Sequence, residues 1–254
     1  MKLAATPAFC AALLTSAVFA APAFAAMAPG MPMPAAGAPA AAPITAERPA
    51  ADVVRDDHRK PLEVMAFVGV KPGMKVAELG SGGGYYTRML SKAVGPTGKV
   101  YAIATQAQET AGRLANLRAL AGVLGNVEVV VAPDLASWKT PAPVDVVWTT
   151  ENYHDFHNGP TANIPGLNKA AYDNLKPGGV FYVEDHSAAP GAGLAATAAV
   201  HRMDEAVAKT ELTAAGFKLD GETNLLRNPA DNRAGSNSEA GSFVTDRFGL
   251  RMKK

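Results

Sequence analysis

Three glycines at alternate positions follow an acidic residue, Glu78, at the end of a short apolar segment. They are Gly80, Gly82 and Gly84. Residues 75–79 predict a strand and residues 85–94 predict a helix with one apolar face. Glycine permits a tight turn and lets a ligand approach the backbone without a Cβ in the way. The segment therefore predicts a ligand-binding loop at the carboxyl end of a parallel strand.

The spacing of these glycines excludes two common nucleotide-binding loops. The dinucleotide pattern G-x-G-x-x-G would need a glycine at Tyr85 or at Thr87, and the Gly-Lys-Ser/Thr of a P-loop is absent. Glu78 would repel a pyrophosphate but can hold a cation. The loop therefore favours a positively charged ligand that carries no phosphate.

Polar residues gather after the fourth predicted strand, in a segment that contains Asn152, His154, Asp155 and His157. Further candidates follow later strands, namely Asp185, His186 and His201. His154 or Asp155 could act as a general base or position a substrate, because a histidine can take up a proton near neutral pH. Alternatively, the histidines and Asp185 could bind a metal, although His-x-x-His is a loose spacing and fixes no ligand set. The third possibility is that they are hydrogen-bonded loop residues.

Several motifs give the chain a resemblance to a known family. The segment Glu78-x-Gly-x-Gly-x-Gly resembles motif I of class I S-adenosylmethionine (SAM)-dependent methyltransferases. Leu175–Gly179 and Ala214–Phe217 are similar to later motifs of the same family. The stretches Gly82–Arg88, Asn152–Asp155 and Leu225–Pro229 are similar to a group of exported bacterial proteins known only as predicted methyltransferases.

The resemblance implies that SAM is the cofactor and that it binds at Glu78 and the three glycines. It also implies roles for residues after the next two strands. The family usually has an acid at the end of its second strand, where this chain has Ala104, so Thr105 or Gln106 is the candidate for a neutral substitute. Asp134 is the candidate partner of the adenine amino group. His154, Asp155 and Asn152 stand where the family places its catalytic and substrate-binding groups.

Three functions are compatible with these residues. The first is methyl transfer to a small molecule, since the Pro-Pro that DNA and protein amide methyltransferases carry after the fourth strand is absent. The second is an exported binding protein that has kept the fold and lost catalysis, which the missing acid at Ala104 favours. A remote third is a metal-dependent enzyme that uses the histidine-rich segment.

Strands that alternate with helices predict an α/β, Rossmann-like domain with helices on both faces of a seven-stranded, mostly parallel sheet. The last two strands have no helix between them, which predicts an antiparallel hairpin at one edge. The predicted strands are residues 75–79, 99–104, 126–131, 144–149, 180–184, 218–226 and 242–252. The predicted helices are a short one that begins at 55–61, and residues 85–94, 106–124, 163–175 and 201–215.

The first 50 residues differ from the rest in composition. Lys2, an apolar run to Ala20 and the small residues at Ala23 and Ala25 predict a signal peptide over residues 1–25. Its alanines and Pro7 disfavour a membrane anchor. Residues 26–50, rich in Ala, Pro, Gly and Met, predict a flexible linker, and residues 51–254 predict the methyltransferase-like domain. We therefore expect a periplasmic or secreted protein without stable membrane insertion after cleavage.

Composition narrows the partners. The chain of 254 residues has a formal net charge of +1, and this argues against a nucleic-acid partner, which would require clustered basic residues. The single cysteine, Cys10, lies in the predicted signal peptide, so the mature protein should have neither a disulfide nor a cysteine nucleophile. The expected partner is a small-molecule substrate, and the sequence specifies no oligomeric state.

Overall fold

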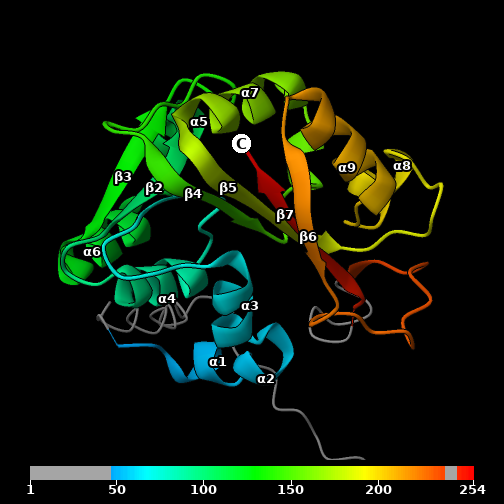
Figure 1. Ribbon diagram of the computed structural model, residues 1–254, viewed down its shortest axis with the longest axis horizontal. Helices are drawn as coiled ribbons and strands as arrows, with labels where there is room; N and C mark the ends of the chain where they lie inside the picture. Colours follow the sequence, from blue (N-terminus) through cyan, green and yellow to red (C-terminus); the bar gives the residue numbers. More distant parts are fainter. Residues whose placement is uncertain (1–46, 238–244) are drawn as a thin grey trace, which may run out of the picture. The chain divides into compact units, whose positions relative to one another are not determined.

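The computed structural model describes residues 47–237 and 245–254, and these contain one sheet in the order β3-β2-β1-β4-β5-β7-β6 (Figure 1). The strands are β1 (Lys75–Leu79), β2 (Lys99–Thr105), β3 (Val127–Ala132), β4 (Val144–Thr150), β5 (Leu175–His186), β6 (Lys218–Thr223) and β7 (Arg247–Lys253). Strands β1 to β5 pair in parallel, and β7 runs antiparallel to both β5 and β6. This confirms the predicted Rossmann-like fold with an antiparallel pair at one edge.

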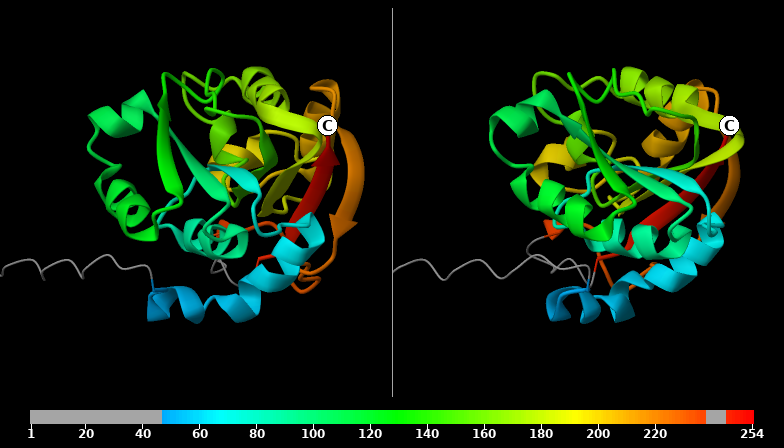
Figure 2. Two further views of the ribbon diagram at one scale, coloured as in Figure 1. Left: turned by 60° about the vertical axis from the view of Figure 1, so that its left-hand side comes forward. Right: turned by 90° about the vertical axis from the view of Figure 1, so that its left-hand side faces the viewer.

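Helices cover both faces of the sheet (Figure 2). They are α1 (Ala50–Val53), α2 (Asp56–Arg59), α3 (Pro61–Val68), α4 (Tyr85–Val94), α5 (Gln106–Thr110), α6 (Ala115–Leu124), α7 (Ile164–Asn174), α8 (Ala195–Ala199) and α9 (Glu205–Ala214), with a 3-10 turn, η1, at Asp155–His157. In the described ranges, no helix has the length and apolar character needed to cross a membrane.

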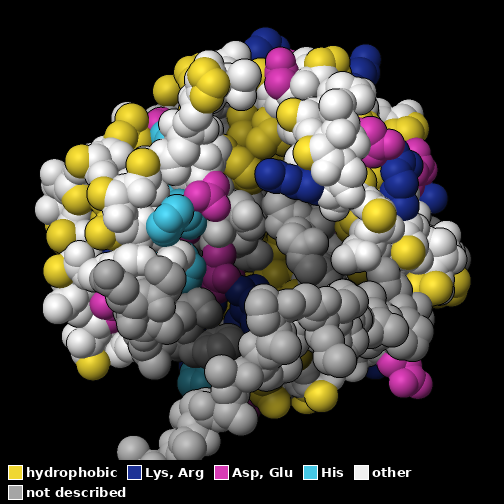
Figure 3. Space-filling model, turned by 180° about the vertical axis from the view of Figure 1, so that it is seen from behind, with side chains coloured by type: hydrophobic (Ala, Val, Ile, Leu, Met, Phe, Trp, Pro, Cys, Tyr) yellow, Lys and Arg dark blue, Asp and Glu magenta, His cyan; other side chains and the backbone are white. Residues whose placement is uncertain are grey.

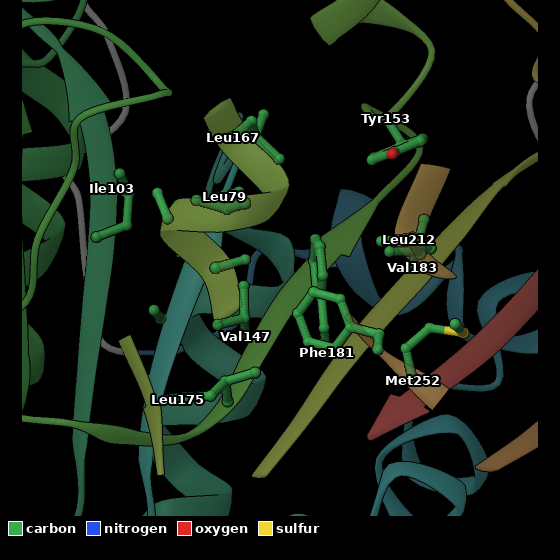
Figure 4. Packing of buried hydrophobic residues seen from close by; sticks show 14 of the residues in the cluster. Leu79, Ile103, Val147, Tyr153, Leu167, Leu175, Phe181, Val183, Leu212 and Met252 are labelled. Carbon is green, nitrogen blue, oxygen red and sulfur yellow. The ribbon is translucent and has the colours of Figure 1, made fainter. Parts of the chain in front are cut away.

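Two apolar clusters hold the layers together. On one face, Leu167 of α7 and Leu212 of α9 pack against strand residues such as Phe181 (Figure 4). On the other face, α3 and α4 pack against Tyr182 and Trp148, and α6 packs over β3. Successive side chains of a strand point to opposite faces, so each inner strand contributes to both clusters. The sheet is therefore buried on both sides, and the carboxyl ends of β1 to β5 form a common edge where ligands can bind.

Strand β1 and helix α4 have the predicted bounds at both ends. Their sequence signal is local, because an apolar strand is followed at once by glycines and then by an amphipathic helix. Gly84 caps α4 with a left-handed φ of 84°, and Gly95 ends it at a φ of 66°. Such φ values suit glycine, which explains why the glycines mark both helix ends.

The predicted helix over residues 106–124 is wrong in its middle. It is interrupted between α5 and α6, where Gly112 has a φ of 68°. A residue with this φ cannot continue a right-handed helix. The regularly spaced leucines belong to α6 and its N-cap Leu114 alone, and α5 contains none.

The predicted helix over residues 201–215 begins too early. His201 has a left-handed φ of 52°, and α9 begins only after Asp204, whose carboxylate accepts a hydrogen bond from the backbone N–H of Ala206 at 3.0 Å. Aspartate is a favoured N-cap because it satisfies an N–H that the helix leaves unpaired. His201 consequently lies in the loop between α8 and α9, and not on the surface of a helix.

Other bounds differ by a few residues. The predicted fifth strand, 180–184, is part of a longer strand that runs from Leu175 to His186, and the predicted strand 218–226 ends at Thr223. The first predicted helix is two helices, α2 and α3, with Lys60 between them at a left-handed φ of 40°. The first described helix, α1, starts at Ala50, one residue before the predicted start of the domain.

The signal-peptide prediction, residues 26–46 of the predicted linker, and residues 242–244 of the last predicted strand lie outside the described residues. Strand β7 occupies Arg247–Lys253, so its described part agrees with the predicted strand to within one residue at its carboxyl end.

Candidate active site

The glycine loop between β1 and α4 has one packed side and one open side. Gly84 is on the packed side, since a Cβ there would lie 2.4 Å from the Leu120 side chain. On the open side, a Cβ at Gly82 would meet only the Gly80 carbonyl oxygen, at 4.0 Å, and one at Gly83 would meet nothing within 4 Å. The packed side explains one glycine by sterics alone, whereas the open side has room for a ligand against bare backbone.

Asn152 connects the end of β4 to this loop. Its side-chain amide donates to the Gly80 carbonyl at 3.2 Å and to the Thr150 carbonyl at 2.5 Å. A Cβ on Gly80, whose φ is 74°, would lie 2.7 Å from the Asn152 side chain. Asn152 therefore positions the glycine loop in this structure, and its predicted catalytic role stays a prediction.

Glu78 lies inside the protein, beneath the glycine loop. Its side chain is buried and accepts a hydrogen bond from the Thr87 hydroxyl of α4 at 2.6 Å. Burial raises the pKa of Glu78 to about 7, against the opposing effect of that hydrogen bond. The structure thus holds this carboxyl buried against α4, and its predicted cofactor-binding role stays a prediction.

Three of the predicted site residues line one pocket of about 210 Å³ between the ends of β2 and β3 and the turn η1: Thr105, Asp134 and Asp155. The Thr105 hydroxyl accepts from the backbone N–H of Gln108 at 3.3 Å in the capping box of α5. Asp134 accepts from Ala136 at 2.9 Å in its own turn. The pocket is smaller than the roughly 300–1,000 Å³ of a typical ligand site, so it suits only part of a cofactor.

Ala104, which stands where the resemblance places an acid, is buried in the apolar cluster under α4 and α6. Strand β2 contains no carboxylate, and the residue that follows Ala104 at its end is Thr105. The cofactor would therefore have to be held here without a charge-assisted hydrogen bond from the end of β2.

His154, Asp155 and His201, which we call the histidine cluster, meet at the carboxyl ends of β4 and β5. The His154 Nε2 lies 3.3 Å from Asp155 Oδ1, and the His201 Nδ1 lies 3.5 Å from the same oxygen. Behind them, the buried Asp185 carboxylate is 2.8 Å from the His154 Nδ1 and accepts from the His154 backbone N–H at 2.7 Å. The cluster thus combines residues from two chain segments, and Asp185 supports it from a third.

The two carboxylates around His154 control its protonation. Burial lowers the pKa of His154, but the hydrogen bonds to Asp155 and Asp185 outweigh burial and raise this pKa to about 10. The hydrogen bond from His154 in turn lowers the pKa of Asp155. In this arrangement the imidazole is a cation at neutral pH, so a base role for His154 requires that Asp155 first move away.

The other two histidines behave differently. His186 is near His154, with ring centroids 6.2 Å apart, and its Nδ1 lies 2.7 Å from the Thr245 hydroxyl. His157 points the opposite way, toward α9, where its Nε2 is 3.0 Å from Glu211. Of the candidate histidines, His154, His186 and His201 therefore lie near one another, and His157 is not part of the group.

Sequence reasoning missed a buried group of charges beside this site, which we call the arginine–glutamate network: Arg59, Glu151, Glu184 and Arg247. Arg247 lies 2.6 Å from Glu151 and 3.3 Å from Glu184, and Arg59 donates to Glu151. Burial raises the pKa of Glu184 to about 7, whereas in Glu151 the two arginines outweigh burial and lower the pKa. The available signal was a charged residue, Arg247, at the start of the last strand, directly before Phe248.

The space-filling view shows histidine and acidic side chains next to one another on one face of the protein (Figure 3). Asp155 and His201 each expose 49% of their side chains, whereas the side chains of Arg247 and Glu184 expose 2% or less. Only the histidine cluster is therefore open to a ligand from solvent.

Residues 60–183 match the family model for protein-L-isoaspartate(D-aspartate) O-methyltransferase. A protein-L-isoaspartate O-methyltransferase of Arabidopsis thaliana is 32% identical over 114 residues, which are 43% of this chain and 45% of the relative. One from Hyperthermus butylicus is 32% identical over 124 residues, 46% of each chain. The chain therefore matches about half the length of these curated relatives.

Solved structures share the fold. A SAM-dependent methyltransferase from Aquifex aeolicus aligns with a TM-score of 0.54 at 22% identity, over 78% of this chain and 92% of its own. The Burkholderia thailandensis 1,6-didemethyltoxoflavin-N1-methyltransferase, solved with its substrate and S-adenosylhomocysteine, aligns at 0.53 and 17% identity over 81% of each chain. Together with the family-model match, they confirm the resemblance to class I SAM-dependent methyltransferases.

Proposed function

We propose that the protein transfers the methyl group of SAM to a small molecule that binds beside the histidine cluster. The observation that carries this proposal is the open side of the glycine loop at Gly82 and Gly83, to which Asn152 connects the segment that bears His154 and Asp155. SAM brings an activated methyl group, so the protein has mainly to align the acceptor with it.

The residues around the loop fit such a cofactor. The backbone at Gly82 and Gly83 can approach it closely because a Cβ there would meet no side chain. The pocket lined by Thr105 and Asp134 lies at the ends of the next two strands, which is where the adenine and ribose would extend. Asp155 lines the same pocket, so cofactor and acceptor groups would be neighbours.

The acceptor is proposed from the part of the chain outside the family match. The curated relatives are named for a protein substrate, but the matched range ends at residue 183. Asp185, His201 and Arg247, which complete the charged groups at this edge of the sheet, all lie beyond it. The family match therefore supports SAM as the methyl donor. That the methyl acceptor is a small molecule is our proposal.

A second candidate, a binding protein without catalysis, has one observation in its favour. Ala104 is buried among apolar side chains where an acid would hold the ribose. For either function we propose a periplasmic or secreted location, on the strength of the predicted signal peptide. N-terminal sequencing of protein from a periplasmic fraction should start at Ala26 or within a few residues, and full-length chain in the cytosol would contradict export.

Calorimetry with SAM and S-adenosylhomocysteine tests cofactor binding. Gly82→Val should weaken SAM binding at least about tenfold, because the side chain would occupy the open side of the loop. The matched control is Gly125→Val, since Gly125 also has a positive φ, 74°, and open space, but lies at the end of α6. Equal SAM affinity in the two variants would mean that the glycine loop is only a turn.

Labelled SAM then tests the acceptor. When small phenols, amines and thiols are tested as acceptors, we expect at least one of them to become methylated. An isoaspartyl peptide should remain unlabelled. Label in the peptide alone would overturn the small-molecule acceptor and support a protein substrate. SAM binding without any labelled product in either set would favour the second candidate, the binding protein.

A further inference from the structure

We infer that His154, Asp155 and His201 form a binding site for a divalent transition-metal ion of the zinc type. The ligand atoms of the three side chains lie within 4.8 Å of one another, and within the described residues no other such group of His, Cys, Asp or Glu occurs. Two imidazoles and one carboxylate are a common ligand set for zinc and for non-haem iron. The hard ions Mg²⁺ and Ca²⁺ prefer oxygen ligands, so they are disfavoured.

The distances suit a tetrahedral ion. Bonds of about 2.0–2.2 Å give ligand-to-ligand separations of about 3.3–3.6 Å in a tetrahedron. Asp155 Oδ1 lies 3.3 Å from His154 Nε2 and 3.5 Å from His201 Nδ1. Two edges of the tetrahedron are thus already present, and the third, between imidazole nitrogens that lie within 4.8 Å of each other, would have to reach the same length when an ion binds.

A buried carboxylate behind His154 orients its imidazole ring. The Asp185 carboxylate, which is inaccessible to solvent, holds the His154 Nδ1 at 2.8 Å and the His154 backbone N–H at 2.7 Å. With Nδ1 engaged, Nε2 is the nitrogen left for the metal. A carboxylate behind a metal-binding histidine fixes its tautomer and ring orientation in most known sites.

The segment that carries His201 is also fixed in place. Its neighbour Arg202 is fully buried and pairs with Asp231 at 2.7 Å, and the Met203 N–H donates to the His186 carbonyl at 2.8 Å. Thr197 of α8 lies 2.9 Å from Asn158, just after η1. The loops that bear His201 and His154 are therefore held together independently of the cluster itself.

The half-exposed Asp155 and His201 leave the solvent side of the site uncovered. A fourth coordination position would point there and accept water or an oxygen or nitrogen of a ligand. If that ligand is the methyl acceptor, which rests on the proposed function, the metal would fix the acceptor atom near Asn152 and the glycine loop. The metal site itself is independent of methyl transfer and can be tested without SAM.

Co²⁺ titration of untagged, chelator-treated full chain tests the site. We expect the visible absorption of tetrahedral cobalt, saturation at one ion per chain, and displacement by Zn²⁺. Asp155→Asn and His201→Gln, both at half-exposed positions, should each weaken Co²⁺ binding about 100-fold or more, since loss of a residue that only hydrogen-bonds to a metal ligand costs about 10–100-fold. His58→Gln, at an exposed histidine outside the cluster, is the matched control and should bind like the wild type.

Circular dichroism of each variant shows whether it has folded. A wild-type protein without the cobalt spectrum, or a spectrum that persists in both cluster variants, would overturn the site. Failure of SAM to bind would leave this result untouched, so the two proposals can fail separately.

Discussion

The arginine–glutamate network and the histidine cluster lie at the same edge of the sheet and contain the same kinds of groups, yet they differ in access. In the network, Arg247 and Glu184 are shielded from solvent and paired with each other. In the cluster, Asp155 and His201 face solvent with half of their side chains. A sealed pair contributes to stability or specificity, whereas an open group can exchange a neighbour for a ligand. Chemistry is therefore expected at the cluster and stability effects at the network.

The largest effect is expected from Arg247→Met. The substitution would leave Glu151 and Glu184 buried without their shared guanidinium, which should lower the free energy of unfolding by about 3–5 kcal/mol. Urea denaturation followed by circular dichroism measures this. Arg118→Gln is the control, because its pair with Glu109 is exposed and should be worth less than about 1 kcal/mol. If the two substitutions lower the free energy of unfolding equally, the arginine–glutamate network does not stabilise the fold more than an exposed ion pair does.

Glu78 provides a contrast with the network, because this buried carboxyl has a hydroxyl neighbour in place of an arginine. Its folded pKa of about 7 is above the ordinary 4.5, so the stability it contributes is fully present below pH 4.5 and is lost as pH rises through about 7. Glu78→Gln should therefore remove up to about 3 kcal/mol of the difference in stability between pH 4.5 and pH 8.

Thermal and urea denaturation at both pH values check the change. Glu128→Gln, at a partly exposed glutamate of β3, should keep the wild-type pH profile. A wild-type profile in Glu78→Gln would mean that the buried carboxyl does not titrate in this range.

The smallest effect on stability is expected from Asp155→Asn. Asp155 exposes half of its side chain, so solvent screens its pairs with the buried His154 and with the half-exposed His201, and their loss should cost about 1 kcal/mol. The same substitution should nevertheless change ligand binding strongly, as described for cobalt above. A loss of stability as large as that of Arg247→Met, measured in the same urea series, would place the cluster with the network as a structural group.

The parts that could be predicted from sequence are those whose signal is local. Strand β1, the glycine loop and α4 follow one another in about 20 residues, and their bounds were predicted correctly. The start of α9 was predicted wrongly, because the left-handed φ of His201 does not change the pattern of apolar residues. The signal that was present is Asp204, a residue type that favours the N-cap position of a helix. The sequence also identified His154, Asp155 and His201 as candidates, but not which of them meet.

The network could not be found from sequence because its members are far apart in the chain. Glu151 is 92 residues from Arg59 and 96 residues from Arg247. Patterns of periodicity cover windows of about 11–18 residues, so they contain no information on such pairs. The sheet order brings them together, since β5 and β7 are neighbours and β4 is next to β5.

The position of β7 between β5 and β6 has a consequence for how the protein folds. The five parallel strands can pair before β7 arrives, but that intermediate would hold Glu151 and Glu184 at the ends of β4 and β5 without the guanidinium of Arg247. Mutual repulsion of the two carboxylates would disfavour the intermediate, and insertion of β7 would relieve the repulsion. Unfolding should therefore be a single cooperative transition, in which loss of the last strand and loss of the parallel sheet occur together.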